Sequence, residues 1–432
     1  MSGLSTARTL ALTSGLRFVV LGIAMATNIL SGRWLGPTGR GDYQVVLSMS
    51  TVAMTVCLIS MDISLSQLYS EAESRRRRRR LMSTAMSVSA VLGLVGGAVA
   101  ALAVLVGSLT AGPFTLGFAL AAVALTALAA LRTMSQRSLF LGGRPVQAAI
   151  ASGVEAVAVL IGVTALGLAG FLSPESFLVL TAAGAFIAVV LGSAVSLMCS
   201  LPERRLLTPL LRRGIAYHPG QVGLVLLVQV EVILLAVFSD PVQVGFYAVA
   251  IALTAPLSVF ATSVSTTFLR RVFTGSADSA AENALRLARV TLLALLPMAL
   301  LLAVTVPFLV PLLWGQAFAG AALPVAVAVI GQLGMAAQKP LGQYFVRQGL
   351  ARLMNQRVFL TLAVKVALCV ALAGPFGAVG AAISAAAGGL VYTTATIHAF
   401  ARQTDRSPVD VWSAAIPRPR DFSAVLSQRN RA

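Results

Sequence analysis

Apolar runs of about 20 residues recur along almost the whole of this 432-residue chain, and no other feature limits its possible folds as strongly. A helix of that length crosses a hydrocarbon layer of about 30 Å. Inside lipid every backbone N–H and C=O group needs a partner within the protein, and a helix supplies these partners along its own length. Because 58% of the residues are hydrophobic and only 11% are charged, the composition excludes an ordinary soluble domain. The sequence predicts an all-α, polytopic membrane protein.

Polar segments and Pro–Gly pairs divide these runs into twelve expected transmembrane helices. The first run is too long for the core of a signal peptide, so we expect it to remain as helix 1. We expect an N-terminal six-helix bundle (1–200), a cytoplasmic linker (201–213), a C-terminal six-helix bundle (214–400) and a disordered cytoplasmic tail (401–432). The expected helices are residues 9–31, 42–68, 81–109, 115–139, 146–168, 177–198, 214–238, 246–268, 290–313, 319–346, 355–373 and 378–400.

A short motif after the first helix returns half a chain later. Residues 33–43 read RWLGPTGRGDY, and residues 238–247 read FSDPVQVGFY. Proline fixes φ and glycine accepts backbone conformations that other residues avoid, so Pro followed four residues later by Gly predicts a tight turn in both copies. The shared turn indicates one six-helix unit used twice. Three residues recur at a constant shift of 204: Pro37, Gly41 and Tyr43 return as Pro241, Gly245 and Tyr247.

Basic residues collect on one side of the expected membrane topology. With the N-terminus inside, all but four of the 32 Lys and Arg residues fall in segments on the inner side. The exceptions are Arg33 and Arg40 on an outer loop and Arg17 and Lys365 within helices. Since basic loops stay cytoplasmic, we expect a protein of the bacterial cytoplasmic membrane with both termini on the cytoplasmic side. Both halves then enter the membrane from the same side, which predicts a parallel repeat about an axis along the membrane normal.

The net charge of +18 and the six arginines at 75–80 would also suit a nucleic-acid-binding protein. The topological bias accounts for the same residues, so we expect membrane lipids and no nucleic acid as partners. Cys57, Cys199 and Cys369 are isolated in the sequence, as are the two histidines. This spacing predicts neither a disulfide nor a metal site, and no cofactor is expected.

Four ionisable residues lie well inside expected spans, where charges usually mark a cavity, a pair or an ion path. Arg17, Glu155 and Lys365 lie roughly 12 Å from the cytoplasmic ends of their helices, from the rise of about 1.5 Å per residue. Glu231 lies about 10 Å from the outer end of its helix. Arg17 could instead extend to the headgroups or pair with Glu155, and Lys365 could also extend to the headgroups. Glu231 has a short side chain and is harder to explain in this way.

Helices 1 and 7 each carry a polar face. Arg17 and Asn28 follow the spacing of one helical face, and Gln221 and Glu231 share a face of helix 7. Arg17 and Gln221 are equivalent under the shift of 204 residues. Two related polar stripes are what a central polar cavity between two bundles requires. Asp62, in helix 2, either lies near such a cavity or caps a broken segment.

Four segments, in order, resemble a known family. LGPTGRGDY (35–43) resembles the first outward loop of polysaccharide flippases in the multidrug/oligosaccharidyl-lipid/polysaccharide exporter superfamily. VGFYAVA (244–250) resembles the start of their eighth helix, LLWGQAFAGA (312–321) their ninth-to-tenth connection, and GPFGAVGAAIS (374–384) their eleventh-to-twelfth connection. The resemblance implies two six-helix bundles facing a cavity. It also implies export of a polyprenyl-pyrophosphate-linked sugar for polysaccharide assembly, with a polysaccharide polymerase as a partner.

The resemblance and the intramembrane charges lead to a first hypothesis, a flippase working by alternating access. Arg17, Lys365, Asn28 and Gln221 would bind the substrate. Arg17 falls where the family often places a cationic cavity residue, and Glu231 where it often has an acidic one. Glu231 and Glu155 would couple a proton or sodium ion or act in gating.

Three other classes compete with this hypothesis. A multidrug cation antiporter of the same superfamily would use Glu231 and Glu155, but two basic residues beside two acidic ones make a poor cation pocket. A membrane enzyme is disfavoured, because the outward loops are short and carry no carboxylate pair or nucleophile–base arrangement. A non-transporting scaffold would leave the intramembrane charges without a role.

Overall fold

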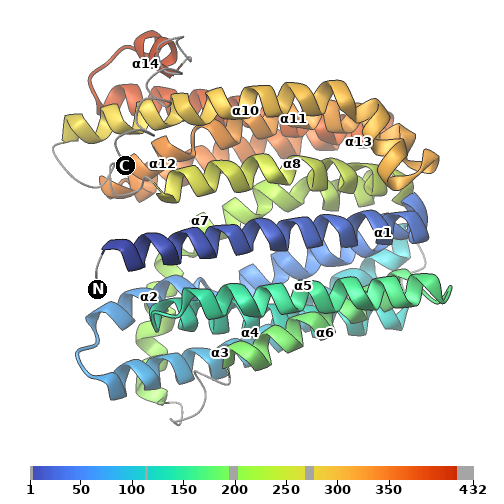
Figure 1. The fold of residues 1–432 in the computed structure, drawn as a ribbon, viewed down its shortest axis with the longest axis horizontal. Helices are drawn as coiled ribbons and strands as arrows, with labels where there is room; N and C mark the ends of the chain where they lie inside the picture. Colours follow the sequence, from blue (N-terminus) through green and yellow to red (C-terminus); the bar gives the residue numbers. More distant parts are fainter. Residues whose placement is uncertain (1–2, 112–114, 194–202, 268–276, 416–432) are drawn as a thin grey trace. The chain divides into compact units, whose positions relative to one another are not determined.

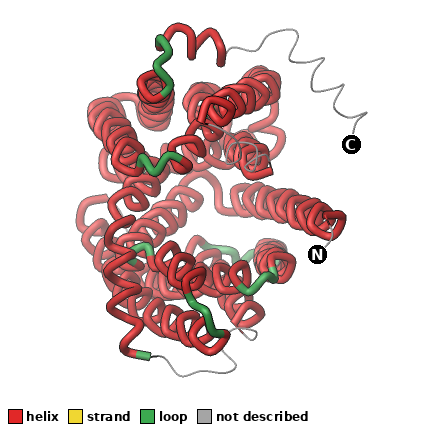
Figure 2. The backbone as a smooth tube through the Cα atoms, turned by 90° about the vertical axis from the view of Figure 1, so that its left-hand side faces the viewer, coloured by secondary structure: helices red, strands yellow, loops and turns green. Residues whose placement is uncertain are grey.

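In the computed structural model, described residues are 3–111, 115–193, 203–267 and 277–415. Within these ranges the chain is helical, with short loops between the helices (Figure 2). The helices are α1 (Gly3–Leu58), α2 (Met61–Glu71), α3 (Arg75–Ala111), α4 (Leu116–Leu141), α5 (Pro145–Leu168), α6 (Pro174–Ser193), α7 (Arg204–Phe238), α8 (Pro241–Thr267), α10 (Ala277–Trp314), η1 (Gln316–Ala321), α11 (Ala322–Ala337), α12 (Lys339–Arg347), α13 (Ala351–Gln403) and α14 (Pro408–Ala415).

Ten segments of the described chain are long and apolar enough to cross a membrane. Two of the ten are double, because α1 is broken at Gly36 (φ 68°, ψ 179°) and α13 at Gly377 (φ 55°, ψ −133°). A positive φ is easily adopted only by glycine, which explains why the chain can reverse at these two points. Counting the arms of α1 and α13 separately gives the twelve predicted spans.

The Pro–Gly motif forms a different local structure from the predicted one. Gly36, one residue before Pro37, makes the break in α1, and Gly41 lies within the helical segment that follows. The second copy behaves in the same way, since α8 begins at Pro241 and contains Gly245. Proline suits the first turn of a helix because the missing N–H has no helical partner there. The expected starts at residues 42 and 246 are therefore wrong, and both helices begin at the proline.

Three further boundaries differ from the prediction. The arginines at 75–80 form the first turns of α3 rather than a loop. The expected linker is helical from Arg204, where α7 begins, ten residues before the predicted start. The predicted helix at 42–68 is broken, because Ile59 and Ser60 have φ near 50° and separate α1 from α2. Hydropathy marks the ends of apolar runs, whereas helical backbone continues through polar residues.

The chain divides into two compact units, Met1–Ala248 with Leu313–Phe318, and Val249–Leu312 with Ala319–Ala432. In the first unit α3 packs on α4, α4 and α5 pack on α6, and α1 packs on α5 and α7 (Figure 1). Glycine permits the close approach of α3 to α4, since a Cβ at Gly97 would lie 2.9 Å from the Val123 carbonyl oxygen.

The second unit has its own apolar core near the ends of several helices. Residues of α10, α12, α13 and α14 form it, among them Leu285, Phe345, Phe400 and Val411, which are all buried. The rings of Tyr344, Phe345 and Phe400 pack against one another, with centroids 4.9 to 6.3 Å apart. The predicted tail is helical to Gln403 and again in α14, and residues 416–432 lie outside the described part. The division into two six-helix repeats remains a prediction.

Candidate functional site

The two copies of the Pro–Gly motif contact each other directly within the first unit. A Cβ on Gly41 would overlap the carbonyl group of Pro241, and a Cβ on Gly245 would overlap the carbonyl group of Pro37. Each glycine thus lets the other copy's backbone approach closely, and the contact is reciprocal. Residues 37–41 and 241–245 are the first helical turns of the second arm of α1 and of α8, and we call them the paired turns. Their reciprocity is what a two-fold internal repeat produces.

A fully buried arginine holds the chain beside the paired turns. The Arg40 side chain donates through Nη1 to the Asn28 carbonyl oxygen (3.0 Å) and the Tyr43 hydroxyl (3.0 Å). Its Nη2 donates to Asn28 Oδ1 (2.7 Å) and to the Ala248 carbonyl oxygen (3.2 Å). Trp314 Nε1 also donates to the Asn28 carbonyl oxygen (3.2 Å). We call these five residues the Arg40 cluster.

The Arg40 cluster joins four separate parts of the chain. Asn28 lies before the break in α1, Arg40 and Tyr43 after it, Ala248 on α8, and Trp314 at the end of α10. Its acceptors are neutral oxygens, which replace the water that the two terminal nitrogens lose on burial, whereas Nε is buried without a hydrogen-bond partner among the described residues. The sequence assigned Arg40 to an outer loop, but the structure buries it. The neighbouring Tyr43 alone does not distinguish the two cases in the sequence, because the other acceptors lie 12 residues earlier, on Asn28, and 208 residues later, on Ala248.

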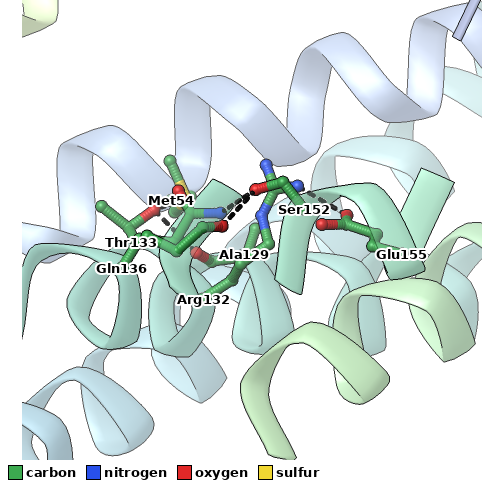
Figure 3. A network of polar contacts seen from close by, with 8 residues as sticks. Met54, Ala129, Arg132, Thr133, Gln136, Ser152 and Glu155 are labelled. Atoms are coloured by element: carbon green, nitrogen blue, oxygen red, sulfur yellow. Dashed lines mark hydrogen bonds and ion pairs between the residues drawn. The ribbon is translucent and has the colours of Figure 1, made fainter. Parts of the chain in front are cut away.

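A second polar group lies between α4 and α5 (Figure 3). It consists of Arg132, Gln136, Ser152 and Glu155, and we call it the Arg132 network. Arg132 Nη1 lies 2.5 Å from Glu155 Oε1, and Gln136 Nε2 donates to Ser152 Oγ (2.9 Å). Glu155 is largely buried, and the arginine that it pairs with is Arg132, not Arg17 as in one of the alternatives from the sequence. The sequence contained a signal for this pair. Arg132 and Glu155 lie at nearly equal distances from the turn between α4 and α5, so an antiparallel hairpin brings them to one depth.

A second arginine of α4 also pairs with an acid on another helix. Arg137 Nη2 lies 2.8 Å from Asp62 Oδ2 on α2. Asp62 was expected to lie near a cavity or to cap a broken segment; it lies in the first turn of α2, directly after the break at Ile59 and Ser60, and its side chain forms this ion pair. In the sequence, Arg132 and Arg137 count only among the basic residues of the inner side. Charge counting alone missed their role in joining α4 to its neighbours.

Other ion pairs lie near the start of α3 and α7. Arg80 Nη1 lies 3.0 Å from Glu203 Oε2, and Arg213 Nη1 lies 2.6 Å from Glu71 Oε1. The hydrogen bond from Arg213 lowers the pKa of Glu71 from its ordinary value. One of the six consecutive arginines, Arg80, thus contributes to tertiary structure within the first unit.

The structure places the remaining predicted site residues on three helices. Arg17 is exposed on α1, and Gln221 is half-buried on α7. Glu231 is 1% exposed on α7, and Lys365 is 3% exposed on α13 in the second unit. The stem of Lys365 lies across Gly388, where a Cβ would overlap it. Two of the predicted charges are thus enclosed by protein. Among the described residues no group of His, Cys, Asp and Glu could hold a metal ion.

We expect the Arg132–Glu155 pair to contribute measurably to stability. In a double-mutant cycle of Arg132→Gln and Glu155→Gln, the coupling should be about 1 kcal/mol, since Arg132 is partly exposed and the pair is partly screened. The coupling energy is measured by unfolding the original protein, the two single variants and the double variant across a series of detergent concentrations. The control is Arg144, which is exposed and has no ion-pair partner among the described residues, changed to Gln with and without Glu155→Gln. Coupling no larger than in the control would contradict the assignment.

Comparisons with known proteins agree with the architecture. The sequence profile of a family described as polysaccharide biosynthesis protein matches residues 7–269. No curated protein sequence matches the chain. The matched region includes the whole Arg132 network, both paired turns and most of the Arg40 cluster.

Solved transporter structures share the fold. The lipid II flippase MurJ in an inward-closed conformation matches with a TM-score of 0.77 and 13% identity, over 94% of this chain and 90% of that one. An inward-facing multidrug resistance MATE transporter of the MOP superfamily matches with 0.62 and 12% identity, over 91% and 99%. A MOP superfamily transporter from Pyrococcus furiosus matches with 0.55 and 11% identity, over 92% and 96%. These matches confirm the predicted all-α, polytopic membrane fold.

Proposed function

Because the chain belongs to the polysaccharide biosynthesis protein family, we propose that it moves a polyprenyl-pyrophosphate-linked oligosaccharide across the membrane. The movement runs from the inner to the outer leaflet of a bacterial cytoplasmic membrane, by alternating access. The chain is a multi-pass membrane protein with a flippase-type transporter fold, and the family profile supports a sugar-containing substrate.

The reciprocal contact of the paired turns carries this proposal. A pathway that opens alternately at its two ends needs a contact that closes one end and separates again. The paired turns meet through glycine and carbonyl groups, so they can separate without extracting interlocked side chains. They form the outer gate, and the described arrangement is the one in which this gate is closed.

With the predicted orientation, the membrane potential favours export of the substrate. The basic bias puts both termini in the cytoplasm and the paired turns on the outer side. Export of a pyrophosphate then moves negative charge out of a negative-inside cell, which is downhill by about 2.3 kcal/mol per charge per 100 mV. Glu231, buried on α7, is the candidate for binding a coupling proton or sodium ion, and Glu155 for a role in gating.

Arg17 and Lys365 attract the pyrophosphate, while Asn28 and Gln221 provide polar contacts. A cation favours entry because the anion would otherwise lose its water without compensation. In the closed gate the Asn28 amide oxygen is bonded to Arg40, so it becomes available only when the cluster opens. The exported unit is the substrate that a polysaccharide polymerase would require on the outer side.

We expect Arg17→Ala to reduce flipping of the lipid-linked sugar in proteoliposomes about tenfold. The expected loss is one charge-assisted interaction with pyrophosphate, and such interactions are worth about 1.5–3 kcal/mol. Arg144→Ala removes an exposed cation outside the proposed pathway and should leave the rate unchanged. Equal rates for the two variants, with normal folding, would remove Arg17 from the mechanism.

Native mass spectrometry of the purified protein tests the substrate class directly. Polyprenyl-pyrophosphate sugars should remain bound as discrete mass additions. A multidrug cation antiporter is the second candidate, because MATE structures share the fold. If the protein retained no lipid-linked sugar and instead bound organic cations, that candidate would replace the first.

A further inference from the structure

A pocket of about 360 Å³ lies between the two arms of α13, in the second unit. Its lining shares no residue with the paired turns, the Arg40 cluster or the Arg132 network. The residues around it come from the beginning of the first arm and the end of the second. They are Leu353, Gln356, Arg357, Leu360, Ala395, His398, Ala399, Arg402 and Gln403.

Arg357 is the unusual member of this lining. It is 3% exposed, and its guanidinium lies 4.2 Å from the centroid of the Phe345 ring. Nη1 donates to Thr396 Oγ1 (2.8 Å) and Nε to the Leu353 carbonyl oxygen (3.3 Å). Within the described part of the chain, Nη2 is buried and has no hydrogen-bond partner. A buried charged donor left unsatisfied in this way is costly, so the positive charge of Arg357 favours an anion in the adjoining pocket.

The rest of the lining has the composition of an anion site. Arg402 and His398 are exposed at the rim, and Gln356 and Gln403 add amide donors. None of the lining residues is acidic. Positive charge is therefore concentrated around Arg357 without a carboxylate to balance it.

The position of the pocket narrows the class of anion. Its residues lie at the two ends of the span 352–403, where the helices leave the apolar layer. Leu360 lines the pocket and is exposed, so apolar and cationic groups stand side by side there. Basic pockets between transmembrane helices at this depth suit lipid headgroups. We propose that the pocket binds a phosphate group, carried by a membrane-lipid headgroup or present as free phosphate.

Titration of the full-length protein in detergent, followed by native mass spectrometry, tests this site. The probes are dioctanoyl phosphatidylglycerol, inorganic phosphate and dioctanoylglycerol, which lacks phosphate. Arg402→Gln should weaken phosphatidylglycerol or phosphate binding about fivefold, because one cation near the surface is worth about 1 kcal/mol. Arg357→Gln should weaken it about tenfold or more. The exposed variant keeps the test valid if the buried one fails to fold.

Arg352→Gln is the matched control, since Arg352 is exposed at the same end of α13 and does not line the pocket. Its affinity should stay within about twofold of the original. Binding confined to phosphatidylglycerol assigns the pocket to a lipid, and equal binding of inorganic phosphate assigns it to the free ion. Equal affinities in Arg402→Gln and Arg352→Gln, or equal binding of dioctanoylglycerol, would overturn the proposal.

Discussion

Gly41→Ala should reduce transport in proteoliposomes about tenfold or more. The added methyl group would overlap the Pro241 carbonyl, and backbone atoms cannot move aside as a flexible side chain can. Overpacking of this kind costs about 1–3 kcal/mol, which shifts a balanced two-state gate about tenfold toward its open form. Gly245→Ala should have a similar effect, because its contact with Pro37 is the reciprocal one.

Gly22→Ala is the matched control for this prediction. Gly22 lies on the first arm of α1, before the break at Gly36, and a Cβ there would meet no atom within 4 Å. Ser31 is buried beside the Arg40 cluster, with its Oγ 3.3 Å from the Tyr43 hydroxyl. A cysteine in its place, in a background without the three native cysteines, reports opening of the gate. Its labelling by a membrane-impermeant maleimide should rise in Gly41→Ala and not in Gly22→Ala. Equal transport and labelling in the two variants would mean that the paired turns are not a gate.

Arg40→Ala should lower the free energy of unfolding by about 3 kcal/mol. The change removes a fully buried guanidinium that donates four hydrogen bonds, and it leaves oxygens of Asn28, Tyr43 and Ala248 without that donor. Losing buried charged hydrogen bonds has costs of this size. Arg40→Lys should recover only part of the loss, since one ammonium cannot reach acceptors arranged around a planar guanidinium. Thermal unfolding in detergent measures the series.

Arg33→Ala provides the comparison for Arg40→Ala. Arg33 belongs to the same motif but is exposed, and its Nε donates to the Leu313 carbonyl oxygen (2.6 Å). The expected loss is below about 1 kcal/mol, as for most exposed substitutions. If Arg40→Ala and Arg33→Ala were equally stable, the Arg40 cluster would not hold these segments together.

The run lengths in the sequence were sufficient to predict the membrane fold. A bilayer leaves few options for twenty consecutive apolar residues, so the number of helices follows from counting. The predicted helix starts differ from the observed ones at Pro37, Arg75 and Arg204. The prediction used hydropathy, which shows whether a residue prefers lipid or water and not whether its backbone is helical. Helix length depends instead on backbone hydrogen bonding, which arginine supports as well as leucine.

The candidate site was predictable only where local geometry brings residues together. Recurrence of the Pro–Gly motif identified the two segments that meet, but their contact joins Gly41 to Pro241, and no local rule gives that pairing. Arg40 looked like a solvated loop residue because three of its four acceptor atoms belong to Asn28 and Ala248, 12 and 208 residues away. The Arg132–Glu155 pair was accessible in principle, since the α4–α5 hairpin fixes its register. All six predicted site residues remain predictions in their functional roles: Arg17, Asn28, Glu155, Gln221, Glu231 and Lys365.

A fluorescent polyprenyl-pyrophosphate oligosaccharide, followed across the bilayer of sealed proteoliposomes, tests the proposed function most directly. Leaflet position is read with a membrane-impermeant quencher, beside a parallel assay of organic-cation efflux. The account predicts protein-dependent movement of the lipid-linked sugar, accelerated when the membrane potential favours exit of negative charge, and no cation efflux. Movement of the cation while the lipid-linked sugar stays in its original leaflet would contradict it.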